Sequence, residues 1–232
     1  MKNLLVLVAL CGIWTSCDHK TGSGNLVTQT RSVGSFDALS VGGGFEVEIK
    51  AGSPSKVVIE ADDNIIEDIE ARVDDGKLKI SLNDGLSLND AHMKVFITSD
   101  DINHISSSAS AEVVALDELK SDKTIILKAS SGSKITADIN SPAADADASS
   151  GSDIIVKGKT RTFKAESSSG ATIKASDLLS ENTTAQVSSG ASARVHASVA
   201  LNAKASSGGN ITYRGAATAV KKESSGGSIE KE

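Results

Sequence analysis

Thr124–Ile139, with the sequence TIILKASSGSKITADI, shows the pattern that decides the fold of this chain. On both sides of the central Ser-Ser-Gly, apolar and polar residues alternate, which is typical of β-strands with one buried face. The tripeptide occurs six times, and the steps between its glycines are 19, 19, 20, 18 and 18 residues. A period of about 20 residues is too short for helical-hairpin repeats and indicates an all-β protein whose coils stack into a parallel β-helix, or β-solenoid.

The alternation also predicts which side chains point into the solenoid. We expect each coil to contain three short strands and their corners, with small inner residues that suit a narrow cross-section. The expected inner residues of four successive coils are Ile154 and Val156, Ile173 and Ala175, Ala193 and Val195, and Ile211 and Tyr213. The expected outer residues are Asp153, Lys157, Thr172, Lys174, Arg194, His196, Asn210, Thr212 and Arg214, with Ile155 as the one apolar residue among them.

The Ser-Gly pairs predict a structural ladder along one corner of the solenoid. Each glycine is expected at a positive φ, which other residues resist. Each preceding serine is expected to face inward, where its hydroxyl would bond to stacked serines or to corner backbone. No His and acidic residue recur with these serines, so nothing activates them as nucleophiles. The ladder consists of Ser131 and Gly132, Ser150 and Gly151, Ser169 and Gly170, Ser189 and Gly190, Ser207 and Gly208, and Ser225 and Gly226.

The first half of the domain is expected to form strands without the short repeat and to cap the solenoid. Two alternating runs around Asp74-Asp75-Gly76 predict a hairpin. Residues 64–70 fit one or two helical turns or a strand, and Gly42–Gly44 fits a flexible strand entry. Ile105–Val113 resembles a degenerate coil in which Ser110 takes the place of the glycine. The remaining expected strands are 45–50, 56–61 and 93–99. The charges of the last coil suggest a polar cap at the other end.

The amino terminus predicts export. Residues 1–16 combine one lysine, a short apolar run and small residues before Cys17, as in a bacterial lipoprotein signal peptide. We expect Cys17 to be lipidated, residues 17–30 to form a flexible tether, and residues 31–232 to form a single domain. Trp14 departs from the usual leucine-rich signal, so a secreted protein without a lipid is the alternative.

Charge and motif spacing narrow the classes of partner. The net charge of −6 argues against nucleic acid. The four histidines, His19, His92, His104 and His196, lack the spacing of a metal site, so we expect no metal and no cofactor. Asp145 and Asp147 are the one acidic pair worth testing for glycoside chemistry, and alternation places both on an outer face among lysines rather than across a cleft.

With these motifs assembled, the chain resembles the bacterial family described as putative auto-transporter adhesin, head GIN domain. The resemblance runs from Arg31 to the C-terminus, where Ser108–Ala111 replaces the family's usual Ser-Gly-Ser-Gly. It implies a β-solenoid on an exported, often lipid-anchored protein, and it brings no catalytic or binding residues. The matching segments are Arg31–Leu39, Val41–Gly44, Phe45–Ile49, Val57–Ala61, Ala71–Ile80 and the Ser-Gly-rich coils.

Together these observations predict a non-enzymatic lipoprotein of the cell envelope. We expect a lipid anchor in the outer membrane, on its periplasmic or surface side, and a glycan or protein ligand on the solenoid face. Two alternatives remain: a structural module of envelope assembly without an adhesion role, and a polysaccharide-active β-helix enzyme that uses Asp145 or Asp147. The sequence leaves the oligomeric state open.

Overall fold

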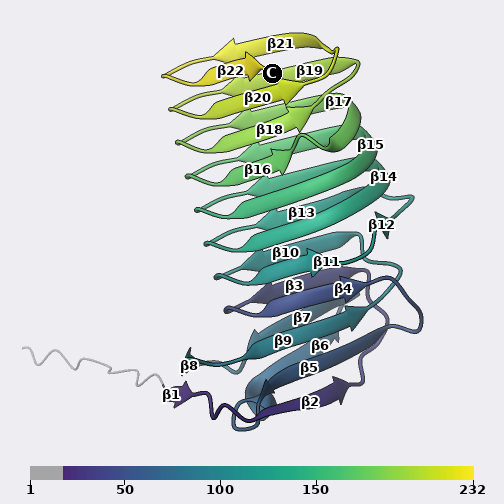
Figure 1. Ribbon diagram of the computed structural model, residues 1–232, viewed down its shortest axis with the longest axis vertical. Helices are drawn as coiled ribbons and strands as arrows, with labels where there is room; N and C mark the ends of the chain where they lie inside the picture. Colours follow the sequence, from purple (N-terminus) through teal and green to yellow (C-terminus); the bar gives the residue numbers. More distant parts are fainter. Residues whose placement is uncertain (1–17) are drawn as a thin grey trace, which may run out of the picture.

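The computed structural model describes residues 18–232, which form a flattened solenoid of strands stacked along one axis (Figure 1). The strands lie on two opposite faces, which we call the front face and the back face. In stacking order, the front face contains β2 (Leu26–Arg31), β5 (Lys56–Asp62), β9 (Met93–Thr98), β4 (Glu46–Lys50), β11 (Glu112–Ala115), the first halves of β14 (Lys134–Ala148) and β15 (Asp153–Ser167), β16 (Thr172–Ala175), β18 (Ser192–His196), β20 (Asn210–Arg214) and β22 (Ser228–Lys231).

The back face has the matching order. It contains β6 (Ile69–Asp74), β7 (Lys77–Leu82), β3 (Ala38–Gly42), β10 (His104–Ser108), β13 (Ile125–Ala129), the second halves of β14 and β15, β17 (Leu178–Val187), β19 (Ala200–Ala205) and β21 (Thr218–Glu223). Three short elements lie outside these rows: β1 (Asp18–Thr21), β8 (Leu86–Asn89) and β12 (Leu119–Lys120).

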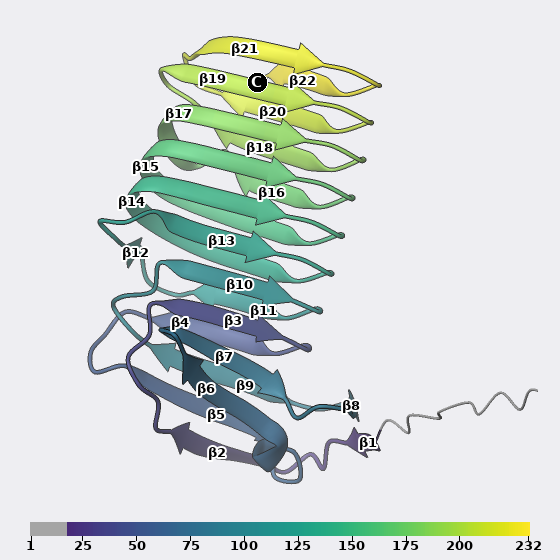
Figure 2. The ribbon, with the colours of Figure 1, turned by 180° about the vertical axis from the view of Figure 1, so that it is seen from behind.

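Each coil therefore has two strands, and the expectation of three was wrong. A back strand reaches a tight Ser-Gly turn, and the chain returns along the front face, as β13 leads into β14. The chain then bends near Ser141 and continues onto the back face within the same strand. We call the two sides of the rod the turn edge and the bend edge; the pointed turns lie at the left of Figure 1 and at the right of Figure 2. Sheets packed face to face lie about 10 Å apart, so small inner side chains fill the gap.

The predicted inner and outer positions are confirmed. The strands are parallel and in register, so that residue 135 stacks on 154 and residue 137 on 156. Because every coil keeps this register, inner residues stack on inner residues through the whole array, and each coil covers its neighbour's apolar side chains. The inner residues from Ile154 to Tyr213 are all buried, and the outer residues, Ile155 included, are exposed or half-buried.

The first coil precedes the non-repeating segment. β3 and β4 form that coil, and the chain then leaves it to build β5 to β9 before it returns as β10 and β11. The expected hairpin is β6 and β7, which pair antiparallel around Asp75-Gly76. Residues 64–70 contain one 3₁₀ turn, Ile66–Asp68, and the start of β6. One apolar cluster extends from Phe36 to Ile229, so the described chain has a single core.

Most of the segment expected to be a flexible tether is instead ordered. β1 pairs in parallel with β8, and β2 pairs antiparallel with β5. The buried carboxylate of Asp62 accepts hydrogen bonds from the N–H groups of Gly24 at 2.7 Å and His92 at 2.8 Å. These bonds attach the loop between β1 and β2 to the domain. The polar residues and glycines of this segment resemble a linker, but its backbone pairs with two neighbouring strands, β8 and β5. Within residues 18–232, no helix has the length and apolar character needed to cross a membrane.

Polar residues occupy inner positions at both ends of the rod. In β2, Arg31 lies at an inner register position and donates to the carbonyl oxygen of Ile66 at 2.8 Å. In β21, Lys221 and Glu223 occupy the register positions that hold alanine in the coil below. The Lys221 ammonium lies 4.8 Å from the centre of the Tyr213 ring, and the Glu223 carboxylate accepts from the N–H of Ile229 at 2.6 Å. Inward charges at an edge strand cover the core and oppose pairing with another sheet.

We predict that apolar residues at the last inner positions will cause end-to-end association. Lys221→Val combined with Glu223→Val replaces the charged cap with a surface on which another coil can stack. Analytical ultracentrifugation should show concentration-dependent association of this variant. Lys222→Val, on the outer face of the same strand, is the matched control and should sediment like the wild type. Equal association of the two variants would contradict a capping role for the inward charges.

Glycines at the bend edge serve a different purpose from those at the turns. Gly158 and Gly215 have φ values of 110° and 106°. A Cβ at Gly215 would lie 2.0 Å from the carbonyl oxygen of Ala197, whereas a Cβ at Gly170, in a turn, would meet nothing within 4 Å. The bend therefore needs glycine for close packing between coils, and the turn needs it for backbone conformation alone.

These two environments predict different costs for the same substitution. Gly170→Ala should lower the free energy of unfolding by about 1 kcal/mol, the strain of a left-handed backbone. Gly215→Ala should lower it by about 3 kcal/mol or more, because overpacking adds to that strain. Urea denaturation followed by circular dichroism measures both values. Equal costs would show that the contact with Ala197 does not limit this position.

Candidate functional site

The Ser-Gly pairs form a column of tight turns along one edge of the rod. All six glycines have positive φ, between 69° and 76°, and the serine before each has a φ between 48° and 53°. Two successive positive φ values are typical of a type I′ turn. In one of these turns, the N–H of Ala171 donates to the carbonyl oxygen of Ser168 at 3.1 Å. Each turn is thus closed by a bond between the residues that flank the Ser-Gly pair.

Backbone hydrogen bonds join these turns from coil to coil. The N–H of Gly132 donates to the carbonyl oxygen of Ser150 in the next coil at 3.1 Å, and Gly151 donates to Ser169 at the same distance. The bond repeats along the column to Gly208 and Ser225. The parallel hydrogen-bond ladder therefore continues through the turn edge, which leaves the central backbone of the turns paired.

The expected inward orientation of the serines was wrong. Ser131, Ser150, Ser169, Ser189, Ser207 and Ser225 are all exposed. The two central residues of a type I′ turn lie beyond the ends of both strands, so strand alternation stops before them and resumes after the glycine. The inner residues next to the first turn are Ala129 and Ser133, on either side of the exposed pair.

Buried serines at other positions make the bonds to corner backbone. The Ser133 hydroxyl donates to the carbonyl oxygen of Ser107 at 2.8 Å, and the Ser152 hydroxyl donates to that of Ala129 at 2.8 Å. The hydroxyls of Ser107 and Ser167 each donate to the carbonyl oxygen of the residue four positions later, Ala111 and Ala171. These hydroxyls have structural partners, which is what a buried polar group requires.

The turn column also contains two members without the tripeptide. Ala109 and Ser110 have φ values of 46° and 63°, which confirms the degenerate coil. Gly43 and Gly44, at 90° and 77°, form the turn of the first coil rather than a loose strand entry. The alternating residues on both sides of Gly43-Gly44 indicate a turn between two strands. The inserted strands separate this turn from the next one, so the period of about 20 residues is not visible there.

Asp145 and Asp147 lie on the outer back face, as alternation predicts. Asp145 stacks between Ile126 and Lys164, and Asp147 stacks between Lys128 and Glu166. Lys164 pairs with Glu166 at 2.8 Å, and that hydrogen bond raises the pKa of Lys164. The carboxylates thus form part of a row of alternating charges on a flat strand surface.

The histidines lie apart from one another. His92 contacts Glu60 at 2.9 Å, and Nδ1 of His196 lies 3.2 Å from the carbonyl oxygen of Ser180. Burial, with a further contribution from Lys128 and Lys77, lowers the pKa of His104 below its usual value. Across residues 18–232, no three His, Cys, Asp or Glu side chains come together in a way that could hold a metal ion.

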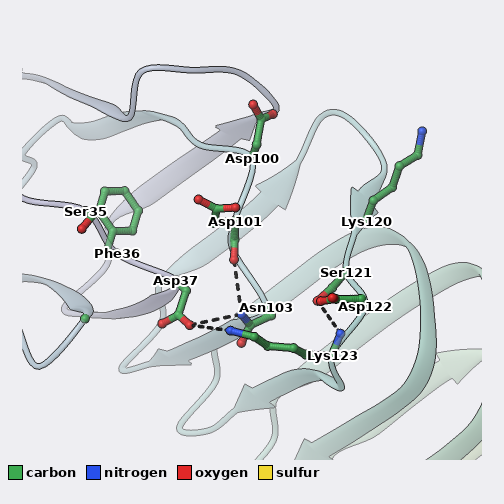
Figure 3. Close-up of a pocket in the computed structure, with 11 residues that line it drawn as sticks. Ser35, Phe36, Asp37, Asp100, Asp101, Asn103, Lys120, Ser121, Asp122 and Lys123 are labelled. Atoms are coloured by element: carbon green, nitrogen blue, oxygen red, sulfur yellow. Dashed lines mark hydrogen bonds and ion pairs between the residues drawn. The ribbon is translucent and has the colours of Figure 1, made fainter.

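A cavity of about 510 Å³ lies where the inserted strands rejoin the coils (Figure 3). Three loops line it, and each precedes a back-face strand: Asp37 before β3, Asp100–Asn103 before β10, and Lys120–Lys123 before β13. The Asp37 carboxylate accepts from the Asn103 amide at 3.4 Å and lies 3.5 Å from the Lys123 ammonium. These contacts hold the three loops together, so Asp37, Asn103 and Lys123 have a structural role here.

A second hollow, of about 540 Å³, lies on the outer front face, and we call it the front groove. Apolar side chains, Leu116 and Ile155, line one part of it, and the cations Lys174 and Arg194 line another. The rest of the lining includes Glu118, Thr136, Asp138, Lys157, Ser176, Asp177 and Arg214. It combines an apolar surface with charged groups, as small-molecule sites do.

Solved structures with this architecture come from Bacteroides and Parabacteroides species. An adhesin-like protein of Bacteroides fragilis, described as a putative adhesin, has a TM-score of 0.84 at 20% identity, over 92% of this chain and 100% of its own. A putative lipid binding protein of Parabacteroides distasonis has a TM-score of 0.71 at 19% identity, over 93% and 100%. A putative adhesin of Parabacteroides merdae has a TM-score of 0.68 at 19% identity, over 93% and 99%. At these identities the likeness shows a shared fold.

No curated protein matches this chain significantly. The family model described as putative auto-transporter adhesin, head GIN domain, matches residues 35–217, which span the first coil, the inserted strands and the coils up to the loop before β21. That range covers most of the chain and agrees with the motifs from Arg31 onward. The chain belongs to the family of putative auto-transporter adhesins with a head GIN domain.

Proposed function

We propose that this protein is exported, is held at the cell envelope by a lipid on Cys17, and binds a partner through the outer faces of its solenoid without catalysing a reaction. Membership of an adhesin-like family supports location outside the cytoplasm. The lipoprotein-type signal before Cys17 supports the anchor. Cys17 itself lies outside the described residues.

The observation that carries the binding role is the in-register stack. From β4 to β22 the front face has seven steps between neighbouring strands, or about 34 Å at about 4.8 Å a step. Every coil adds outward side chains at fixed spacing on a hydrogen-bonded backbone. Stacked coils of this kind give extended surfaces that contact a ligand at several points. A glycan or protein on such a surface fits the adhesin description of the Bacteroides fragilis structure.

The ordered N-terminus adds a geometric argument. β1 begins at Asp18, the residue after the proposed lipid site, so no linker residue lies between Cys17 and the first strand. β1 and β2 lie at the N-terminal end of the rod, and the C-terminal coils lie at the opposite end (Figure 1). A protein anchored through Cys17 would hold its base close to the membrane and its coils away from it, where an external partner can reach them.

We predict that Cys17→Ser will abolish the lipid anchor. Because serine lacks the thiol that accepts the lipid, radiolabelled palmitate should mark the wild-type protein and not the variant. The variant should also move from the membrane fraction to the soluble envelope fraction. Asp18→Asn is a neighbouring control and should keep the label. An unlabelled wild type would contradict the anchor and leave a secreted protein.

Accessibility to protease on intact cells separates adhesion from envelope assembly. If the coils face outward, external protease should digest them, and the purified protein should bind a glycan or protein of a partner surface. Protection from protease, with recovery of envelope proteins in a pull-down, would contradict the adhesin role and support an assembly module.

A further inference from the structure

We propose that the front groove binds an anionic amphiphile, a single acyl chain with a negatively charged head group. The inference deepens the binding role proposed above and rests on it, but it does not depend on the lipid at Cys17. Its basis is the order of side chains along the groove, which places an apolar surface below a pair of cations.

Among residues 18–232, two cations that line the groove, Lys174 and Arg194, have no ion pair, and of its anions only Asp177 has none. Lys157 pairs with Asp138 at 3.3 Å, Arg214 pairs with Glu232, and Glu118 is paired outside the groove with Lys120 at 3.2 Å. Lys174 and Arg194 form no ion pair with any side chain of residues 18–232. They stack directly on each other in neighbouring coils, β16 and β18. Two exposed cations on adjacent strands, whose backbones lie about 4.8 Å apart, can bind one phosphate or carboxylate between them.

The apolar end of the groove lies on the N-terminal side of these cations. Leu116 is 46% exposed, although it lies in a hollow rather than on a projecting loop. Ile155 stacks between Thr136 and Lys174, so it lies directly next to the cationic end. Covering these side chains stabilises a complex because it removes apolar surface from water. The two side chains form an apolar surface on which an acyl chain can pack.

The dimensions agree with one amphiphile. From the coil of Leu116 to that of Arg194 the groove crosses four strand steps, about 19 Å at about 4.8 Å a step. A volume of about 540 Å³ is in the range of small-molecule sites. The stems of Lys174 and Arg194 are themselves apolar, so they can extend the surface toward the charged ends.

A linear polyanion fits the groove less well. It would place a negative charge beside Asp138 and against Leu116, where the groove offers no cation without a partner. A neutral lipid would cover the apolar end but leave Lys174 and Arg194 without the anion that their position favours. The amphiphile alone uses both ends of the groove.

Isothermal titration with dodecyl phosphate, below its micelle concentration, tests this proposal. The protein carries Cys17→Ser, so that no lipid of its own can occupy the groove. We expect one saturable site, and Lys174→Gln with Arg194→Gln should weaken binding at least tenfold. Lys204→Gln with Lys222→Gln is the matched control, because these lysines also stack in neighbouring coils but lie on the back face. The control pair should bind dodecyl phosphate like the parent protein.

Chain length tests the apolar end separately. Ile155→Thr keeps a β-branched residue on an outer strand position, so the coil should remain folded. It should weaken binding of dodecyl phosphate more than binding of butyl phosphate. No saturable binding, equal loss in the control pair, or equal affinity for inorganic phosphate and for dodecyl phosphate would each overturn the proposal. A protein that adheres to a partner surface but binds no amphiphile would overturn this inference alone and leave the proposed function in place.

Discussion

The structure depends on the in-register stacking of parallel coils. No coil can bury its own inner face, because each contributes only one strand to the front and one to the back. Neighbouring coils supply both the covering side chains and the backbone partners, and residues 134–148 pair with residues 153–167 almost without interruption. The turns take part in the same ladder, since the glycine N–H of one turn donates to the serine carbonyl of the next. The backbone conformation of the turns, the burial of the inner side chains and the hydrogen bonds between coils therefore all repeat once per coil.

A stack of this kind has two open ends, and the chain treats them differently from its middle. Internal coils place mostly apolar residues at inner positions, together with buried serines and threonines that form hydrogen bonds. The first and last strands place Arg31, Lys221 and Glu223 there, and each of these side chains bonds to backbone groups or lies over a ring at the end of the core. The N-terminal end has a further cover, because β5, β6 and β2 run antiparallel to their neighbours and end the parallel repeat.

The outer faces differ in chemistry although they share a backbone. On the back face, Asp145, Asp147, Lys164 and Glu166 form a row in which opposite charges neutralise one another. The front face has a hollow in which Leu116, Ile155, Lys174 and Arg194 lack such partners. In the cavity of Figure 3, Asp37, Asn103 and Lys123 connect the loops that line it. Burial and pairing thus distinguish surfaces that composition alone would treat as equivalent.

The sequence by itself determined the repeat, the parallel solenoid, the inner and outer residues of the coils and the family, because strand alternation and a glycine every 18 to 20 residues are local signals. It also indicated the hairpin at Asp75-Gly76 and the degenerate coil at Ser110. Only the tertiary structure decided that a coil has two strands, that Ser131 and its equivalents point outward, that Gly43-Gly44 belongs to the turn column and that residues 18–31 pair with the domain. The pairing of residues 18–31 and the place of Gly43-Gly44 depend on which distant strands become neighbours in the fold. The direction of the serines depends on whether a turn has one or two residues beyond the ends of its strands. The front groove is of the same kind, since Leu116 and Arg194 meet one surface only after intervening coils have stacked.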